Sequence, residues 1–95
     1  MKKLAVSQHF QKQLKKLSRH DQQKVASTLK QFLEHLNRND LPLGLGLKKI
    51  NGDKYEIRVD IRTRIVMKLE EDTFVCHLVG NHEDVRRYLR DYRNS

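Results

Sequence analysis

The chain has 95 residues, of which 37% are hydrophobic and 34% are charged, and its formal net charge at pH 7 is +8. This length allows one domain with a single modest core. A small domain this basic is expected to meet a polyanion, either nucleic acid, an acidic protein or, less often, a membrane surface, although Lys and Arg could instead only keep it soluble.

Cysteine usage and hydropathy exclude several classes of protein. Cys76 is the single cysteine, so a disulfide framework within the chain and a cysteine metal cluster are both excluded. We expect Cys76 to be a small buried residue of the core. No apolar run is long enough to span a bilayer or to serve as a signal peptide. We therefore expect a cytoplasmic protein that needs no metal and no cofactor.

The N-terminal third of the chain predicts an edge strand followed by two helices. Residues 3–6 form the short apolar strand, and Ser7 offers an N-cap to the first helix, which ends near Ser18. Asp21 is a candidate cap for the second helix. The apolar residues of the two helices recur at helical spacing: Phe10, Leu14 and Leu17, then Val25, Leu29, Phe32, Leu33 and Leu36. The short connection predicts an antiparallel helical hairpin.

Residues 37–46 contain Asn, Asp, Pro and two Gly, and are predicted to form a loop. Leucines recur in and just after this loop: Leu41, Leu43, Leu45 and Leu47. They could pack onto the sheet or form a patch that binds a partner, and we expect packing.

Three strands are predicted between residues 55 and 79. Apolar and polar residues alternate over 55–61, and the pattern resumes over 65–69 after a break at Arg62 and Thr63, as in a β-hairpin. An acidic turn at 70–72 precedes a third segment that is rich in β-branched and aromatic residues. Consecutive strands of this kind predict an antiparallel meander.

A third, C-terminal helix completes the expected order. Its apolar residues recur at i, i+3, i+4 and i+7: Val85, Tyr88, Leu89 and Tyr92. The predicted order is β-α-α-β-β-β-α, an α+β fold that places an N-terminal helical hairpin and a C-terminal helix on an antiparallel sheet. We expect one domain over residues 1–95.

This order of elements and three local motifs resemble the RelE/ParE superfamily of type II toxins, and the RelE side of it more closely. The first motif is Ser-x-x-Phe-x-x-x-Leu-Lys-Lys-Leu from Ser7 to Leu17. The second pairs Tyr-Glu-Ile-Arg at 55–58 with Thr-Arg-Ile-Val at 63–66. The third is Val-Gly-Asn-His at 79–82. The resemblance covers nearly the whole chain, and it implies an RelE-like fold.

The resemblance also implies an activity and a set of site residues. The activity is that of an mRNA interferase, an endoribonuclease that cuts mRNA in the ribosomal decoding site and inhibits translation. Arg58 and Arg64 match basic residues of the active-site sheet, His82 sits where members carry Arg or His, and Tyr88 matches a C-terminal tyrosine of some members. Glu56 departs from the pattern, because some relatives have a lysine there.

Cleavage of this kind requires removal of the 2′-OH proton, neutralisation of charge at the adjacent phosphate and protonation of the 5′-oxygen. Histidine suits proton transfer near neutral pH, and arginine suits the phosphorane-like transition state. Lys48 and Lys49 are more plausible as ligands of RNA phosphate, and Arg62 and Arg86 are further candidates for RNA binding.

Each of the catalytic candidates also has a structural interpretation. His82 could simply begin the last helix, Arg58 and Arg64 could be surface residues paired with Glu56 or Asp60, and Tyr88 fits the apolar stripe of the last helix.

Partners and competing functions follow from the same resemblance. The expected partner is a small acidic antitoxin, with the ribosome and mRNA as targets and operator DNA contacted only through the antitoxin. One alternative is a ParE-like toxin that inhibits DNA gyrase without cutting RNA. Another is a basic RNA-binding domain without toxin activity.

Overall fold

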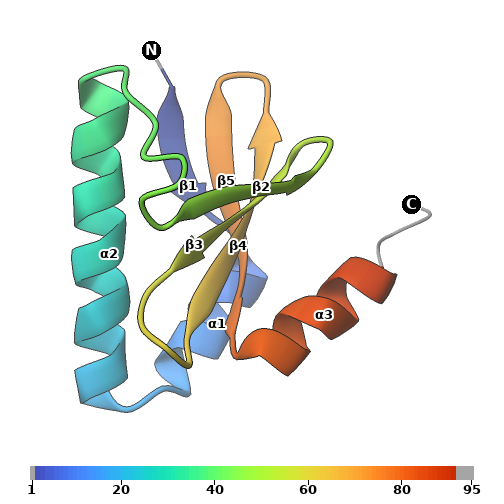
Figure 1. The fold of residues 1–95 in the computed structure, drawn as a ribbon. Coiled ribbons are helices and arrows are strands. Elements are labelled where there is room, and N and C mark those ends of the chain that lie inside the picture. Colours follow the sequence, from blue (N-terminus) through green and yellow to red (C-terminus); the bar gives the residue numbers. More distant parts are fainter. Residues whose placement is uncertain (1, 92–95) are drawn as a thin grey trace.

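The computed structural model describes residues 2–91, which form a five-stranded sheet and three helices (Figure 1). The strands lie in the order β1-β5-β4-β3-β2. The elements in chain order are β1 (Lys3–Val6), α1 (Gln8–Lys15), α2 (Arg19–Asn37), β2 (Leu47–Asn51), β3 (Lys54–Arg58), β4 (Arg64–Glu70), β5 (Thr73–Gly80) and α3 (His82–Asp91). No helix within 2–91 combines the length and the apolar character needed to cross a membrane.

The predicted α+β class, the edge strand and the β3-β4-β5 meander are confirmed, but the prediction of an antiparallel sheet was wrong. β1 pairs in parallel with β5, so the sheet is mixed. A parallel pair needs a long connection, and the chain between these strands passes through both α1 and α2. Residue periodicity within a four-residue strand carries no information about this distant partner.

One strand of the sheet, β2, was not predicted from the sequence. β2 pairs antiparallel with β3 at the far edge of the sheet, and Lys48 and Lys49 lie within it rather than before the hairpin. The strand is short, carries adjacent lysines and has an irregular register after Lys49. These are common features of exposed edge strands, and they hide the alternation by which strands are recognised.

The β3–β4 connection is longer than the hairpin break predicted from sequence. β3 ends at Arg58, so the strand predicted from the alternation over 55–61 stops three residues early, and Ile61 is 86% exposed. The Asp60 carboxylate accepts hydrogen bonds of 2.8 Å from the backbone N–H groups of Arg62 and Thr63, and its other oxygen lies 3.1 Å from Lys24 Nζ. Asp60 therefore shapes this turn and connects it to α2.

The Asp60 turn should make stability depend on pH. The backbone N–H of Arg62 and the Lys24 ammonium lower the pKa of Asp60 from 3.8 to about 2. A carboxyl group with a depressed folded-state pKa stabilises the fold above its unfolded pKa, and this contribution is lost as the pH falls towards 2. Asp60→Asn should therefore lower the free energy of unfolding at pH 7, and the deficit should shrink below about pH 4.

Urea unfolding of both proteins between pH 7 and pH 3 measures this dependence. Asp53→Asn is the matched control, because the Asp53 carboxylate contacts Lys54 and Lys68 only at 3.7 and 4.0 Å. A deficit for Asp60→Asn that stays constant over the whole pH range would show that the carboxylate charge does not stabilise the turn.

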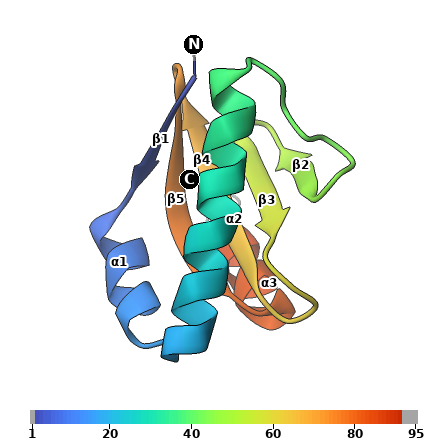
Figure 2. The same cartoon turned by 90° about the vertical axis from the view of Figure 1, so that its left-hand side faces the viewer.

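Helices α1 and α2 cover one face of the sheet and enclose the larger core (Figure 2). α2 reverses the direction of α1, as the predicted hairpin requires (Figure 1). Ser7 caps α1 as expected, but α2 is capped by Ser18, whose Oγ accepts a 3.1 Å hydrogen bond from the Asp21 N–H. The prediction of Asp21 as the cap was therefore wrong. The core residues buried most completely are Phe10, Val25, Phe32, Leu36, Leu47, Ile65, Met67, Phe74 and Cys76.

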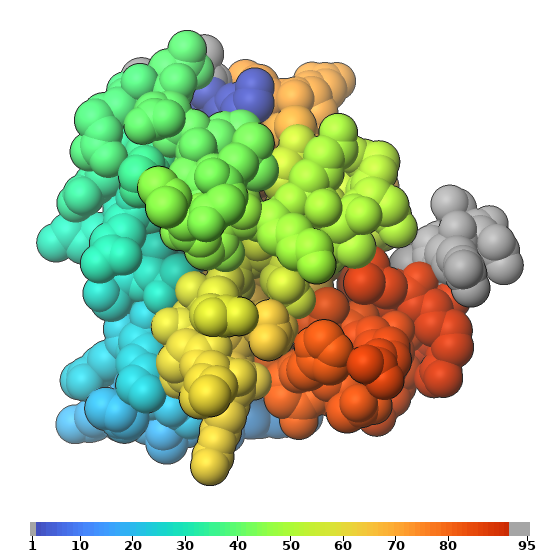
Figure 3. All heavy atoms as spheres, viewed as in Figure 1, coloured from blue at the N-terminus to red at the C-terminus, as the bar shows by residue number. Residues whose placement is uncertain are grey.

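Helix α3 packs on the opposite face against a second, smaller cluster of apolar residues. Val85 is buried there against Val66 and Leu78, and Tyr88 and Leu89 are partly buried. The predicted apolar stripe of α3 is confirmed for these three helix residues, whereas Tyr92 lies outside the described residues. Because α3 covers only part of this face, the rest of the face remains accessible near β2 and β3 (Figures 1 and 3).

The leucines at 41–47 divide between core and surface. Leu47 is buried and Leu41 is partly buried against the core, so packing is confirmed for these two. Leu43 and Leu45 are 53% and 82% exposed, so the prediction that they pack onto the sheet was wrong. Positive φ angles at Gly44 and Gly46, +81° and +110°, turn the chain so that alternate residues do not point to one side.

Cys76 is buried as expected, and its thiol should be unreactive in the folded protein. Burial raises its pKa to about 12, so the thiolate that reacts with disulfide reagents is scarce at neutral pH. We expect negligible labelling of the native protein by an aromatic disulfide reagent at pH 8 and one equivalent labelled in 6 M guanidinium chloride. Rapid stoichiometric labelling under native conditions would contradict this burial.

Candidate functional site

A groove of about 550 Å³ opens on the sheet at the strands that α3 leaves uncovered. In Figure 3 the surface is hollowed between the green residues around β2 and the yellow residues of β3 and β4. The groove is lined by Leu43, Gly44, Gly46, Leu47, Lys48, Lys49, Glu56, Arg58 and Arg64.

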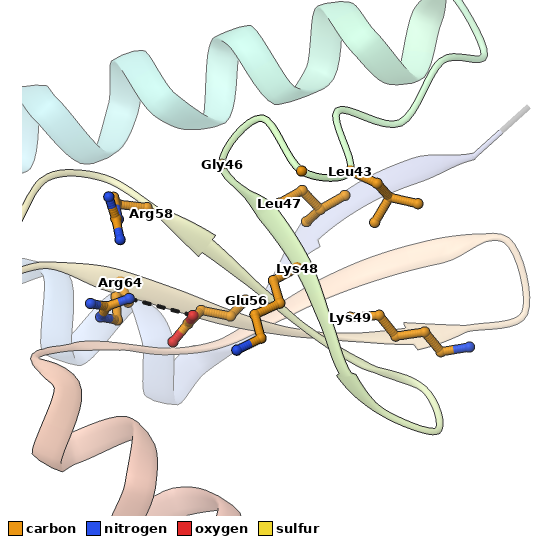
Figure 4. Close-up of a pocket in the computed structure, with 9 residues that line it drawn as sticks. Leu43, Gly46, Leu47, Lys48, Lys49, Glu56, Arg58 and Arg64 are labelled. Atoms are coloured by element: carbon orange, nitrogen blue, oxygen red, sulfur yellow. Dashed lines mark hydrogen bonds and ion pairs between the residues drawn. The ribbon is translucent and has the colours of Figure 1, made fainter.

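Strand register places the charged residues of this groove. Arg58 is paired with Arg64 across β3 and β4, and Lys48 is paired with Glu56 across β2 and β3. Since alternate residues of a strand share a face, Glu56 and Arg58 point to one side while Tyr55 and Ile57 are buried on the other. Figure 4 shows the side chains of Lys48, Glu56 and the two arginines gathered over these strands, with Lys49 pointing away.

The groove contains four cationic side chains and one carboxylate. Arg64 Nη1 lies 3.5 Å from Glu56 Oε2, and both side chains are largely buried, with exposed fractions of 17% and 14%. Arg64 Nε is buried and makes no hydrogen bond to any described residue. Within residues 2–91, the side chains of Lys48, Lys49 and Arg58 form neither an ion pair nor a hydrogen bond. The groove therefore presents several charged donors that are available to an anion.

The lysine and arginine side chains of a second depression, between α1, α3 and the sheet, are already paired. This depression encloses about 660 Å³, and its lining includes Lys54, Lys68 and Arg87. Each of these three has a carboxylate within 4.0 Å, supplied by Asp53 or Asp84. The unpaired cations of the groove around Arg58 and Arg64 distinguish it from this depression.

His82 lies outside the groove, at the first position of α3. It is exposed, and its Nε2 lies 3.1 Å from Arg86 Nη2, so this ring nitrogen accepts while the guanidinium donates. Together with Arg62, it lines a third depression of about 830 Å³ next to the β3–β4 turn. Gly80, two residues before His82, is the register partner of Arg64, and Arg64 is in turn paired with Arg58. The start of α3 therefore lies next to the end of the sheet that carries both groove arginines.

The start of α3 is held by a reciprocal cap. The Asn81 N–H donates to Asp84 Oδ2 and the Asp84 N–H donates to Asn81 Oδ1, both at 2.9 Å. A Cβ atom on Gly80 would lie 2.6 Å from Asp84 Oδ2 and 2.7 Å from Asp84 Cβ. Glycine is therefore required at position 80, because any larger residue would displace the cap that positions His82.

The remaining predicted residues lie apart from the groove. Tyr88 is partly buried against the smaller cluster and lines the second depression, next to Leu78. Arg86 is exposed on α3 and contacts Glu83 at 3.5 Å as well as His82. The structure thus brings together Lys48, Lys49, Arg58 and Arg64, and it places Arg62, His82, Arg86 and Tyr88 elsewhere.

The apolar and glycine wall of the groove, formed by Leu43, Gly44 and Gly46, was not predicted from the sequence. The alternation of Leu and Gly between Leu43 and Leu47 was the available signal, since glycines with positive φ mark a turn that must hold a fixed shape. In residues 2–91 no group of three or more His, Cys, Asp or Glu side chains is arranged to hold a metal ion.

Comparison with known proteins finds similarity in three dimensions. No protein-family model matches the chain, and no curated protein sequence matches it. A chain of the RelB–RelE antitoxin–toxin complex from Methanococcus jannaschii is 27% identical, with a TM-score of 0.67, over 88% of this chain and 96% of that one.

Two further solved structures agree with the first at lower identity. YafQ from E. coli gives a TM-score of 0.62 at 18% identity, over 90% of this chain and 98% of its own. The YoeB–YefM complex from Staphylococcus aureus gives a TM-score of 0.61 at 16% identity, and the match covers 86% of this chain and 98% of that one. The chain therefore has the fold of the RelE, YafQ and YoeB toxins of type II toxin–antitoxin systems, and its resemblance to the RelE/ParE superfamily is confirmed at the level of structure.

Proposed function

We propose that this chain is the toxin of a type II toxin–antitoxin system and that it inhibits translation as a ribosome-dependent mRNA endoribonuclease in the cytoplasm. The observation that carries the proposal is the groove, in which the unpaired Lys48 and Arg58 gather with Arg64 on one face of a toxin-like sheet, while the unpaired Lys49 lines the groove but points away from them. A phosphodiester backbone is the ligand that such a set of donors fits best.

The proposed reaction is attack of a ribose 2′-oxygen on the adjacent phosphate, with departure of the 5′-oxygen of the next nucleotide. Arg58 and Arg64 would bind the phosphate and stabilise the charge that develops on its oxygens, because a guanidinium is always charged and offers a planar fork of donors. Lys48 and Lys49 would bind flanking phosphates along β2.

His82 is the proposed proton donor to the leaving oxygen. It begins the helix that follows Gly80, the register partner of Arg64, and histidine is the side chain used most often for proton transfer in catalysis. Tyr88 is partly buried against Leu78, so we assign it a supporting role in positioning α3. Arg62 and Arg86, at the β3–β4 turn and on α3, are proposed to contact RNA outside the groove.

The proposed partner is an acidic antitoxin, through which operator DNA would be contacted indirectly. The RelE and YoeB structures named above were determined as complexes with RelB and YefM, which supports a partner of this class. A net charge of +8 favours an acidic chain, and a segment that folds on binding could cover the open face of the sheet and its groove.

Mapping of RNA ends in bacteria tests the proposed function. The wild-type chain and an Arg58→Ala/Arg64→Ala variant are induced, and 5′ ends are mapped on a translated and an untranslated copy of one message. Cuts confined to the translated copy, and lost in the variant, are expected. Growth arrest with double-strand DNA breaks and no cuts would support a gyrase inhibitor instead, whereas neither arrest nor cuts would leave a basic RNA-binding domain.

A further inference from the structure

A short loop with a fixed shape forms the apolar wall of the groove. Within the segment 42–47, three backbone hydrogen bonds of 2.9 to 3.3 Å close the loop on itself. A further one, of 3.0 Å, is donated by the Arg58 N–H of β3 to the Gly46 carbonyl. Leu47, at the end of the loop, is buried in the larger core. The wall is therefore attached to the strand that carries Arg58, and it holds a fixed position relative to the groove cations.

Leu43 is the exposed apolar side chain of this wall. It lines the groove and is 53% exposed, whereas Leu47, the other leucine of the lining, is buried. Gly44 and Gly46 complete the wall, and a Cβ atom added to either would meet no atom within 4 Å. Glycine allows a ligand to approach the backbone closely. Leu43 and the two glycines therefore offer a ligand in the groove an apolar surface with open space in front of it.

The cations and the apolar wall follow one another along the groove in an order that suits a strand of RNA. Figure 4 shows Arg58 and Arg64 at one end of the side chains that line the groove and Leu43 towards the other, with Lys48 between them. The phosphates of an RNA strand are anionic, and each of its bases has two apolar faces. A strand whose phosphates lie against the cations would therefore bring a base to the apolar wall.

We propose that the wall formed by Leu43, Gly44 and Gly46 binds a base of the mRNA, on a nucleotide that flanks the cleaved bond. The inference rests on the proposed ribonuclease function and adds a base-binding site to the cations that bind phosphate. The base lies with one face against the Leu43 side chain and the open backbone of the glycines. Its binding fixes the position of the strand in the groove, so that the phosphate to be cleaved lies against Arg58 and Arg64. Leu43 thus binds the substrate without touching the reacting atoms.

The test combines Leu43→Ala with the removal of single bases from the message. Purified ribosomes are programmed with mRNAs in which one nucleotide of the decoding-site codon, or one on either side of it, lacks its base, and second-order rate constants of cleavage are measured. On the intact message, Leu43→Ala should cleave about 3–15-fold more slowly than wild type, because part of the leucine surface is buried against the base. Removal of the contacted base should slow wild type by a similar factor and should leave the rate of Leu43→Ala almost unchanged.

Two control variants assign the effect to the groove. Leu45→Ala shortens a leucine of the same loop that is 82% exposed and does not line the groove, so it should cleave like wild type and remain sensitive to the missing base. Leu43→Met keeps the side-chain volume and should also behave like wild type. All three variants should have melting temperatures close to that of wild type, because each replaced side chain is more than half exposed.

Contrary outcomes separate the inference from the proposed function. Equal slowing of Leu43→Ala on every message, with or without the base, would overturn the inference, because Leu43 would then act through the fold or through another partner. A wild-type rate for Leu43→Ala on the intact message would overturn it as well. In both cases, cleavage by wild type that is lost in Arg58→Ala/Arg64→Ala would leave the proposed function standing. Absence of cleavage of any message by wild type would instead defeat the proposed function itself.

Discussion

Replacement of Arg64 by alanine should slow cleavage of ribosome-bound mRNA by about 10²–10³-fold, the effect expected when one donor to a developing negative charge is removed. Arg64 is the groove cation held most rigidly, because it is largely buried on β4 and paired with Glu56. A rigid donor needs little reorganisation when charge develops on the phosphate, so the loss should appear in the rate of the bound complex rather than in its affinity. Single-turnover cleavage at saturating protein measures that rate.

Two further variants separate geometry from charge. Arg64→Lys keeps the positive charge but loses the planar fork, so it should recover only part of the rate. Arg87→Ala removes an equal charge from α3, where Arg87 contacts Asp84 at 3.5 Å and lies outside the groove. It should cleave at the wild-type rate. Equal losses in Arg64→Ala and Arg87→Ala would mean that overall charge, and not the groove, governs the reaction.

The largest expected effect on stability is at Phe74, where alanine should lower the free energy of unfolding by about 3–5 kcal/mol. Phe74 is completely buried on β5, and its ring packs edge-on against Phe32 of α2 and Tyr55 of β3, with centroids 5.3 and 5.1 Å apart. The variant would lose the burial of the ring and leave a cavity where a helix and two strands meet. Urea denaturation followed by circular dichroism measures the change.

Leu33→Ala is the control for Phe74→Ala. Leu33 belongs to the predicted apolar stripe of α2, yet it is 41% exposed, so its replacement should change the free energy of unfolding by less than about 1 kcal/mol. A larger loss at Leu33 than at Phe74 would contradict the description of the core. The loss of free energy of unfolding expected for Phe74→Ala is a large part of the stability of a small domain. This variant is therefore also expected to be less toxic in cells, because a smaller fraction of it is folded.

Local periodicity predicted the elements that bury one face, and it failed where contacts are distant or the pattern is irregular. α2 and β4 could be predicted because their apolar residues recur with a regular period, over several turns in the helix and several residues in the strand. β2 was missed since its adjacent lysines sit at a sheet edge, and the parallel pairing of β1 depends on β5, some seventy residues away. Ile61 fitted the strand pattern but lies in the turn that Asp60 organises.

The candidate site was also predictable only where it depends on local sequence patterns. Arg58 and Arg64 follow from strand alternation on either side of a turn, which places two such residues opposite each other. His82 was associated with them through the motif at 79–82, and the structure shows instead that its ring points to Arg86 at the start of α3. The central position of Glu56 depends on the register of three strands together, which no single segment of the sequence specifies.

The most direct test of the account is a cleavage assay on one purified mRNA, with and without ribosomes bound at a defined codon. We expect wild-type protein to cut only the ribosome-bound message, at the decoding site, and to leave a 2′,3′-cyclic phosphate that a cyclic-phosphate-specific ligase can capture. The Arg58→Ala/Arg64→Ala variant should leave the message intact. Equal cutting of free and ribosome-bound mRNA by both proteins, or no cutting by wild type, would contradict the central claim that this groove is a ribosome-dependent nuclease site.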